Sequence, residues 1–306
     1  MTFKLGKLVA SLVVAVGALA SPAVQAGPVI IDGTDANDHG SASGGANTSG
    51  WLYMQRALEN LASGVTTSAA KVVSVVGTTG SQAGAAIDSA FNLSVLPGLG
   101  WSLVHVDGTA AIGAFLDTLS TTTTGILYLP TSGNSSGDLD AAELAVVNSK
   151  AASINTFVGG AGNPLQGGGL FAMAETGTGA FGWLTTLIPG IVFTDAGSGG
   201  ITADITLTAA GNAAFAGLSN ADLAGADPWH GYFSGDLGGL SVLGVSNQGG
   251  VQRNLILGGG AGTQIGCGLP GQPPCNNEVP EPETLPLVAI AGLALVLSGM
   301  RRRKAK

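Results

Sequence analysis

The chain has 306 residues, of which 45% are hydrophobic, 10% are charged and 51 are glycine. This hydrophobic fraction is too high for a disordered glycine-rich matrix protein. Residues 27–277 contain four basic and 16 acidic residues, a balance of about −12 (4 − 16) that repels phosphate backbones and argues against nucleic-acid binding.

The first 26 residues have the pattern of a secretory signal peptide. Lys4 and Lys7 precede an apolar run over residues 8–20, and Val24, Gln25 and Ala26 form a small-residue cleavage site. The pattern predicts export and a mature chain that begins at Gly27. A retained membrane anchor is the alternative.

Short apolar runs alternate with helical patterns in the next part of the chain. Apolar and β-branched residues predict strands at residues 27–32, 71–76, 101–106, 125–129 and 168–175. Apolar residues at helical spacing predict helices at 51–62, 83–93, 110–119 and 138–158, the last being the longest and capped by Asp138 or Asp140. Residues 33–50 are expected to form a polar, glycine-rich loop that is long enough to have a function.

This alternation predicts an α/β fold with a doubly wound, mostly parallel sheet of the flavodoxin-like type. A β-sandwich is the main alternative for a secreted chain rich in glycine and threonine, and the long predicted helix argues against it. Further strands at residues 190–195, 201–207, 241–245 and 254–257 and a helical turn at 209–215 are expected to complete and cover the sheet edge. We therefore divide the chain into a signal peptide (1–26), an α/β domain (27–257), a Gly- and Pro-rich linker (258–278) and a C-terminal segment (279–306).

The two cysteines, Cys267 and Cys275, lie in the predicted linker. In an exported chain this spacing favours one local disulfide. A metal site is the alternative, but no histidine lies nearby to complete four ligands. The sequence predicts no cofactor.

Candidate site residues gather where the predicted strands end, because ligands bind beyond the carboxyl ends of an open parallel sheet. The sharpest catalytic hypothesis is a hydrolytic site formed by Asp32, His39, Glu175 and His230. Structural roles are the alternative for each of these residues, and no Gly-x-Ser-x-Gly elbow, phosphate loop or paired metal motif accompanies them. The other polar residues expected at this edge are Asp35, Asp38, Asp107, Ser132 and Asn134.

The histidines have further alternatives. His39 could bind a metal ion beside Asp35 and Asp38, or belong to an Asx-turn loop. His230 lies among aromatic residues, which suits carbohydrate stacking or a sharp structural corner. His105 lies within a predicted strand and is expected to pack in the sheet.

The long predicted helix leading to the glycine-rich segment 167–175 resembles the class I glutamine-amidotransferase-like fold and its ThuA-like relatives. That family places a cysteine nucleophile in a glycine-flanked elbow, whereas Ala174, Glu175 and Thr176 occupy the region here. The family's later His-x-Glu pair is also missing, because Gly231 and Tyr232 follow His230. The resemblance therefore implies the fold without glutaminase chemistry.

The last 28 residues combine three features in a fixed order. A proline motif comes first, an apolar run over residues 285–300 follows, and a basic end completes the chain. The prolines keep the motif extended, the apolar run can enter a bilayer although it is slightly shorter than the roughly 17–25 residues of a spanning helix, and the basic end resists translocation. An ordinary C-terminal anchor would share only the last two features. The residues that define the motif and the basic end are Val279, Pro280, Glu281, Pro282, Arg301, Arg302 and Arg303.

This order resembles the PEP-CTERM sorting signal of Gram-negative bacteria. The resemblance implies recognition by an exosortase-type processing enzyme, transient retention in the inner membrane, and then attachment at the cell surface or release. We expect an exported cell-surface or extracellular-matrix protein with a non-catalytic structural or binding domain, and extracellular polysaccharide is a candidate partner. An extracellular hydrolase or polysaccharide-binding protein that uses the carboxyl edge of the sheet is the alternative.

Overall fold

The computed structural model describes residues 28–65, 69–77, 81–130, 139–159, 167–173, 180–196, 201–202, 205–224, 228–229, 231–247 and 250–259. The predicted signal peptide, the predicted Cys267–Cys275 disulfide and the C-terminal sorting segment lie outside these residues, and so do Glu175 and His230. Within the described residues, no helix is both long enough and apolar enough to cross a membrane.

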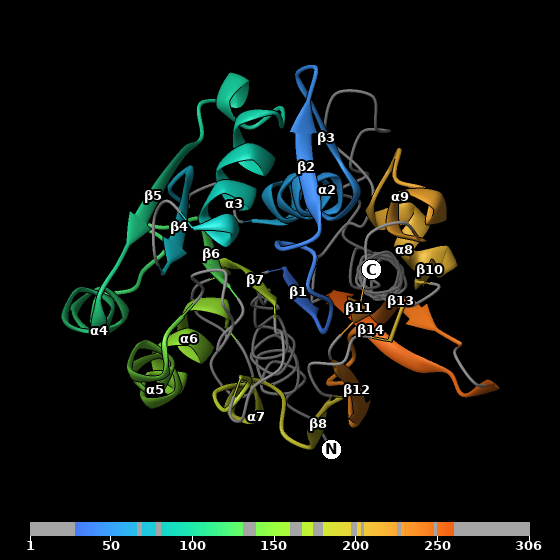
Figure 1. The fold of residues 1–306 in the computed structure, drawn as a ribbon. Coiled ribbons are helices and arrows are strands. Elements are labelled where there is room, and N and C mark those ends of the chain that lie inside the picture. Colours follow the sequence, from blue (N-terminus) through green and yellow to red (C-terminus); the bar gives the residue numbers. More distant parts are fainter. Residues whose placement is uncertain are drawn as a thin grey trace, which may run out of the picture.

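Strands and helices alternate through the first half of the domain, and short strands dominate the second half (Figure 1). In chain order they are β1 (Val29–Asp32), β2 (Gly40–Ser43), β3 (Ala46–Thr48), α2 (Ser49–Gly64), β4 (Val72–Val76), α3 (Gln82–Asn92), the 3₁₀ helix η1 (Pro97–Leu99), β5 (Ser102–Val106), α4 (Thr109–Asp117), β6 (Ile126–Leu129), α5 (Ala141–Ser149), α6 (Ala151–Val158), β7 (Gly169–Met173), α7 (Leu184–Leu187), β8 (Ile191–Asp195), β9 (Ile201–Thr202), β10 (Ile205–Leu207), α8 (Ala209–Ala214), α9 (Asn220–Ala224), β11 (Pro228–Trp229), β12 (Gly231–Gly235), β13 (Ser241–Ser246) and β14 (Arg253–Gly259).

In the described residues, a mixed 10-stranded sheet forms the centre of the domain, with the order β10-β13-β14-β1-β7-β6-β4-β5 along its main path. Along the part of this path that runs β1-β7-β6-β4-β5, each strand is parallel to the next. β14 runs antiparallel to β1, so that Val29 pairs with Gly259, and β13, β10, β12 and β8 extend the sheet by antiparallel pairing. The structure confirms an α/β fold with a large mixed sheet.

The position of β1 differs from the expected flavodoxin-like order. In that order, 2-1-3-4-5, the first strand lies between the second and the third. Here β1 lies between β7 and β14, and β4 lies between β5 and β6. All four residues of β1 are buried, which requires a central strand. A short buried run shows that its strand is central, but it does not specify the neighbouring strands.

Helices cover both faces of the sheet (Figure 1). Successive strand residues point to opposite faces, so Ile30 packs in one hydrophobic core with α2 and α3, whereas Val29 and Ile31 pack in the other with α4, α5, α6 and α7. Tyr128 and Leu127 of β6 divide between the same two cores. Buried residues of α8 and α9 join the core on the α2 side.

The predicted helix over residues 138–158 is wrong in its continuity, because α5 and α6 are separate helices joined at Lys150. Asp140 begins α5 with a capping box: its side chain accepts hydrogen bonds from the backbone N–H groups of Ala142 and Glu143, and the Glu143 side chain accepts one from the Asp140 N–H. The buried residues Leu144 of α5 and Ile154 of α6 face the same core. The apolar pattern therefore continues across the break and does not reveal it.

Other expected boundaries also change. Residues 33–50 are not an irregular loop, because β2 and β3 form a hairpin whose turn contains Gly44 (φ 61°) and Gly45 (φ 82°). Two glycines with positive φ suit a two-residue hairpin turn. The strand expected at residues 201–207 divides into β9, which pairs with β11, and β10, which pairs with β13.

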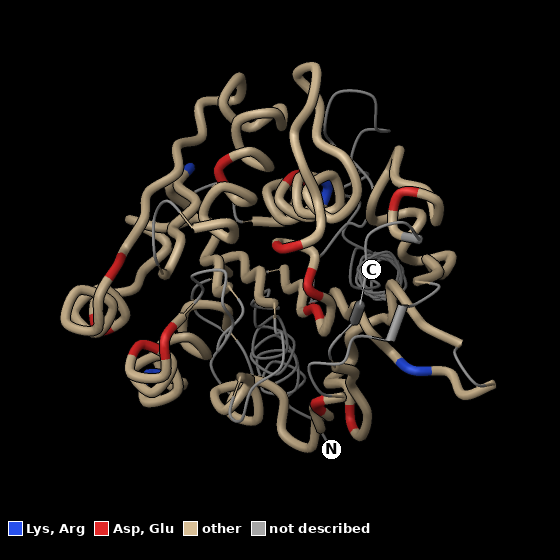
Figure 2. Tube along the Cα trace, in the orientation of Figure 1, with Lys and Arg blue, Asp and Glu red and all other residues tan. Residues whose placement is uncertain are grey.

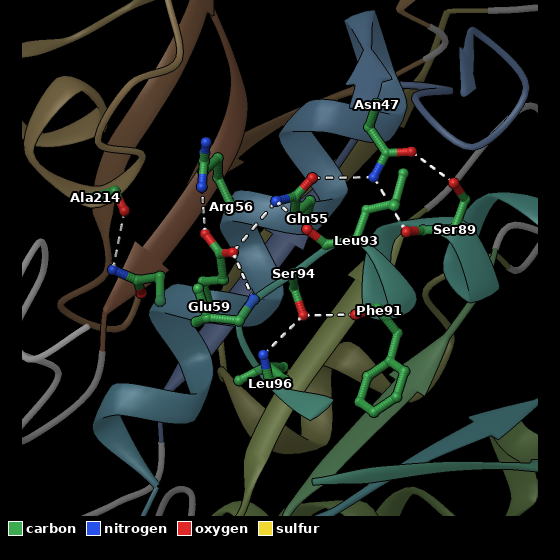
Figure 3. A network of polar contacts seen from close by, with 12 residues as sticks. Asn47, Gln55, Arg56, Glu59, Ser89, Phe91, Leu93, Ser94, Leu96 and Ala214 are labelled. Carbon is green, nitrogen blue, oxygen red and sulfur yellow. Dashed lines mark hydrogen bonds and ion pairs between the residues drawn. The ribbon is translucent and has the colours of Figure 1, made fainter. Parts of the chain in front are cut away.

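A chain of polar contacts ties the hairpin to α2 and α3 (Figure 3). Asn47 Nδ2 donates to Gln55 Oε1 (3.0 Å), Gln55 Nε2 donates to Glu59 Oε1 (3.3 Å), and Arg56 Nη1 donates to Glu59 Oε2 (2.6 Å). Asn47 also accepts from the Ser89 hydroxyl of α3 (2.6 Å). The side chain of Glu59 is only 5% exposed, so its carboxylate has lost most of its solvation. The hydrogen bonds and the ion pair with Arg56 offset the free-energy cost of this burial.

Acidic positions are spread over both helical layers, and few basic positions accompany them (Figure 2). Two of the basic side chains in the described residues make ion pairs, Arg56 with Glu59 and Lys150 with Asp117. The Arg253 guanidinium lies over the Tyr232 ring, 5.7 Å from its centroid. The charge distribution agrees with the acidic surface inferred from composition.

Candidate functional site

The carboxyl end of β1 carries the most unusual ionisable group in the described residues. Asp32 is the last residue of the strand, and its side chain lies on the α2 face because it alternates with Ile31. The residue is 0% exposed. Burial of a carboxyl group at the ligand-binding edge of a parallel sheet makes this position the first to consider as a site.

Thr34, two residues further along the chain, donates a hydrogen bond to each carboxyl oxygen of Asp32. The Thr34 backbone N–H donates to Oδ1 and the Thr34 hydroxyl donates to Oδ2, and both donor–acceptor distances are 2.7 Å. The residue between them, Gly33, has no room for a side chain, because a Cβ atom there would lie 2.3 Å from the carbonyl oxygen of Gly231. The turn therefore brings the backbone of β12 against the end of β1.

Burial raises the pKa of Asp32 from its ordinary value of 3.8 to about 7. The loss of solvation dominates this shift, and the two hydrogen bonds from Thr34 oppose it by stabilising the charged form. Near neutral pH, the carboxyl group is consequently divided between its charged and neutral forms.

The Tyr53 hydroxyl of α2 interacts with Asp32 from the helical layer. Tyr53 is 0% exposed, and its ring packs edge-on against Phe171 (6.2 Å between centroids) and Phe215 (5.1 Å). Burial, followed by the negative charge of Asp32, raises the pKa of Tyr53 well above its ordinary value. The hydroxyl makes no hydrogen bond of ordinary geometry, so its contact with Asp32 is a loose one.

His39 is paired with a different carboxylate. Its Nε2 atom lies 3.1 Å from Asp35 Oδ2, and the backbone N–H of Asp38 donates to the Asp35 carbonyl to close the turn between them (3.0 Å). The His39 side chain is 32% exposed, whereas that of Asp35 is 4% exposed. Within the described contacts, His39 thus partners Asp35, while Asp32 is bonded to Thr34.

The start of α2 holds this loop in place. The Trp51 indole N–H donates to the Asn37 carbonyl (2.8 Å), and the Gly50 N–H donates to the His39 carbonyl (2.8 Å). A Cβ atom on Gly50 would lie 2.2 Å from the Ala36 carbonyl oxygen, so only glycine permits this approach. The polar side chains of the loop are therefore positioned by backbone contacts with the helix.

The predicted catalytic set is described only in part. Asp32 and His39 lie in the same loop, and Glu175 and His230 lie outside the described residues. The convergence of the four residues stays a prediction. Within the described residues, no three His, Cys, Asp or Glu side chains come together to hold a metal ion, and this includes Asp35, Asp38 and His39.

A small hollow lies at the carboxyl ends of β4 and β6. It has about 10 Å³ of space and is lined by Val75, Val76, Gly77, Ala83, Gly84, Tyr128 and Pro130. This volume is close to the minimum for one water molecule. The described residues therefore leave room there for about one water molecule.

Two contributors to the site were missed by sequence reasoning. Thr34 lies two residues after the aspartate that ends a predicted strand, and could have been recognised as the third residue of an Asx turn. Tyr53 lies within a predicted helix, and only its proximity to Asp32 in the fold makes it part of the site. His105, expected to pack in the sheet, lies 2.8 Å from Asp88 Oδ1 of α3 through Nε2.

Comparisons with protein-family models, with curated proteins and with solved structures found no match to this chain.

Proposed function

We propose that the protein is exported, processed through a PEP-CTERM sorting signal and retained at the cell surface or in the extracellular matrix, where its α/β domain has a structural or binding role. The observation that carries this proposal is the order of the last 28 residues: the Val279–Pro282 motif, the apolar run and the arginine cluster. The signal-peptide pattern of residues 1–26 supports it independently.

β14, the last of the described strands, ends away from the candidate site. Gly259 pairs with Val29, at the end of β1 opposite to Asp32. The chain therefore leaves the described domain at the end of β1 that is opposite to Asp32.

The contacts of Asp32 favour a structural role over catalysis. A general base or nucleophile must come within hydrogen-bonding distance of its substrate. Asp32 is 0% exposed, and Thr34 occupies both of its oxygens. His39, which a hydrolytic site would need beside it, is bonded to Asp35.

For the domain we propose a relationship to the doubly wound, flavodoxin-like class, to which the class I amidotransferase-like proteins also belong. Helices on both faces and five adjacent parallel strands support this relationship. The position of β1 and the antiparallel extension from β14 distinguish the domain from the usual member of that class.

Processing can be tested by changing the motif in the full-length chain. We expect Pro280→Ala with Pro282→Ala to remove the extended backbone that the processing enzyme recognises. The variant should keep residues 285–306 and accumulate in the inner membrane, whereas the wild-type chain should lose them. Mass spectrometry of the C-terminal peptide and cell fractionation measure the two effects.

A matched control is Pro273→Ala with Pro274→Ala, which changes two prolines of the linker and leaves the motif intact. The control should be processed and localised like the wild-type protein. Equal processing of both double variants, or retention of residues 285–306 in the wild-type chain from its native host, would contradict the proposal.

One observation favours the alternative function, an extracellular hydrolase. A carboxyl group with a pKa of about 7 can act as a general acid or base near neutral pH. Hydrolysis of a panel of polysaccharides and glycosides by the purified protein tests this alternative. An activity that Asp32→Asn abolishes and Asp236→Asn retains would support it, because Asp236 is exposed and distant in the chain from the β1 loop.

A further inference from the structure

One edge of the central sheet is open in the described structure. β5 pairs with β4 in a regular parallel register over five residues, and it has no second partner among the described strands. It forms one border of the sheet in Figure 1. The strand at the opposite end of the main path, β10, has only three residues and is packed against α9.

The sequence of β5 does nothing to block this edge. Natural edge strands are commonly protected by lysine, by proline or by a bulge. The β5 segment, Ser-Leu-Val-His-Val, contains none of these, and its register with β4 is unbroken. Val104, at its centre, is one of the exposed large hydrophobic residues of the domain (44%).

The backbone hydrogen bonds show which groups of β5 point outward. The Ser102 N–H donates to the Lys71 carbonyl (2.9 Å), and the Val106 carbonyl accepts from the Gly77 N–H (3.0 Å). In a parallel pair, alternate residues direct both backbone groups to the same neighbour. Ser102, Val104 and Val106 therefore face β4, and Leu103 and His105 direct their N–H and C=O groups away from the sheet.

We propose that β5 pairs with β5 of a second copy of this chain, antiparallel and about a two-fold axis at Val104. This axis places Leu103 opposite His105 of the second copy. Each of the two such pairs exchanges both backbone hydrogen bonds, and the two Val104 residues form the non-hydrogen-bonded pair between them, in which side chains approach most closely. The two sheets become one continuous sheet.

Charge complementarity selects this partner and this direction. The Lys71 ammonium group is held at the amino end of β5 by the Leu99 carbonyl (2.8 Å), and Asp107 follows the carboxyl end as an exposed residue. Antiparallel pairing brings Lys71 toward Asp107 of the second copy, and the two-fold axis repeats the contact. In an otherwise acidic domain, the two copies thus meet with opposite charges at both ends of the strand pair.

The interface is small. One strand pair and two charged contacts bury less area than the roughly 1,200–2,000 Å² of a stable protein–protein interface. The dimer should therefore be reversible and should form as the protein concentration rises.

Sedimentation equilibrium of the full-length chain over a range of concentrations tests the proposal. The wild-type protein should approach the mass of a dimer, and Val104→Lys should weaken dimerisation at least about tenfold by placing two ammonium groups at the axis. Val251→Lys is the matched control, because Val251 is also exposed (55%) but lies outside β5. Circular dichroism checks that each variant is folded.

A charge exchange tests the direction of pairing. Lys71→Glu alone should weaken the dimer about threefold or more, and adding Asp107→Lys should restore most of the loss. Equal dimerisation of wild-type and Val104→Lys chains would overturn the proposal. A wild-type chain that stays monomeric at every protein concentration would also overturn it. So would a Lys71→Glu/Asp107→Lys double variant that dimerises more weakly than either single variant.

Discussion

The carboxyl group of Asp32 and the hydroxyl group of Tyr53 interact in the interior of the domain, and neither residue is exposed to solvent. One comes from the end of β1 and the other from the second turn of α2. The interaction joins the central strand to the helix that covers it, at a point where a charge is costly to bury.

Asp32 should make the stability of the domain depend on pH. Its pKa is about 7 in the folded chain and near the ordinary 3.8 when unfolded, so the folded state binds the proton more tightly. Its contribution is fully present below about pH 4 and is lost as the pH rises to about 7, a change of about 4 kcal/mol. In Asp32→Asn, which is neutral at every pH, this part of the pH dependence should disappear.

Urea unfolding at intervals between pH 4 and 8 measures the effect. Relative to wild type, Asp32→Asn should become progressively more stable as the pH rises. Asp236→Asn, a change at an exposed carboxylate, should retain the wild-type slope. Parallel stability curves for wild type and Asp32→Asn would show that Asp32 does not titrate in this range.

Tyr53→Phe should have little effect on the stability of the domain at low pH, but it should change the pKa of Asp32. The change removes a buried hydroxyl group that makes no ordinary hydrogen bond, so we expect a difference within about 1 kcal/mol. The hydroxyl lowers the pKa of Asp32, and its removal should therefore raise that pKa further. Carboxyl ¹³C NMR titration measures the shift. An unchanged or lower Asp32 pKa would contradict the assigned contact.

Glu59→Gln should destabilise the domain more than a comparable change on the surface. The substitution leaves the partly buried Arg56 without its carboxylate partner and disturbs the contact with Gln55, at an expected cost of about 2 kcal/mol or more. Asp117→Asn breaks the Lys150 ion pair, in which the aspartate side chain is 59% exposed, and should cost less than about 1 kcal/mol. Chemical unfolding at pH 7 compares the two, and equal losses would be inconsistent with the proposed importance of the network.

Gly33→Ala should destabilise the junction between β1 and β12. Its new Cβ atom would lie 2.3 Å from the Gly231 carbonyl oxygen, so the backbone must move, at an expected cost of about 1–3 kcal/mol. Gly98→Ala provides the control, because nothing lies within 4 Å of a Cβ atom there. Thermal unfolding measures both changes. A Gly33→Ala protein as stable as the control would mean that this approach is readily relaxed.

Much of the α/β half was predictable because its signals are local. The apolar runs that became β1, β4, β5, β6 and β7 are short and separated by helical patterns, and the structure has strands at each of them. Local signals do not specify which strands become neighbours. The place of β1 beside β14 depends on the antiparallel strands that follow residue 190, where the periodicity is less regular.

The candidate site was less predictable, for a physical reason. Asp32 was identified because an aspartate ends a buried run, but its unusual pKa depends on complete burial beneath α2. The pairing of His39 with Asp35 is compatible with the spacing of four residues, yet the same letters also suit a metal loop. Only the folded geometry separates a residue that is available to a ligand from one that is bonded within its own loop.

The pairing of Val29 with Gly259 closes the domain head to tail. Neighbouring strands are about 4.7–4.9 Å apart, so a short linker could join residue 259 to residue 28. Opening the chain in the hairpin turn at Gly44 and Gly45 would then give a circular permutant with the same sheet. The parallel strands of the permutant would follow one another in the chain as β4, β5, β6, β7 and β1. Numbered 1 to 5 in this way, they have the order 2-1-3-4-5 across the sheet, which is the flavodoxin-like order. Of the five parallel strands, β1 is thus the first in the native chain and would be the last in the permuted chain.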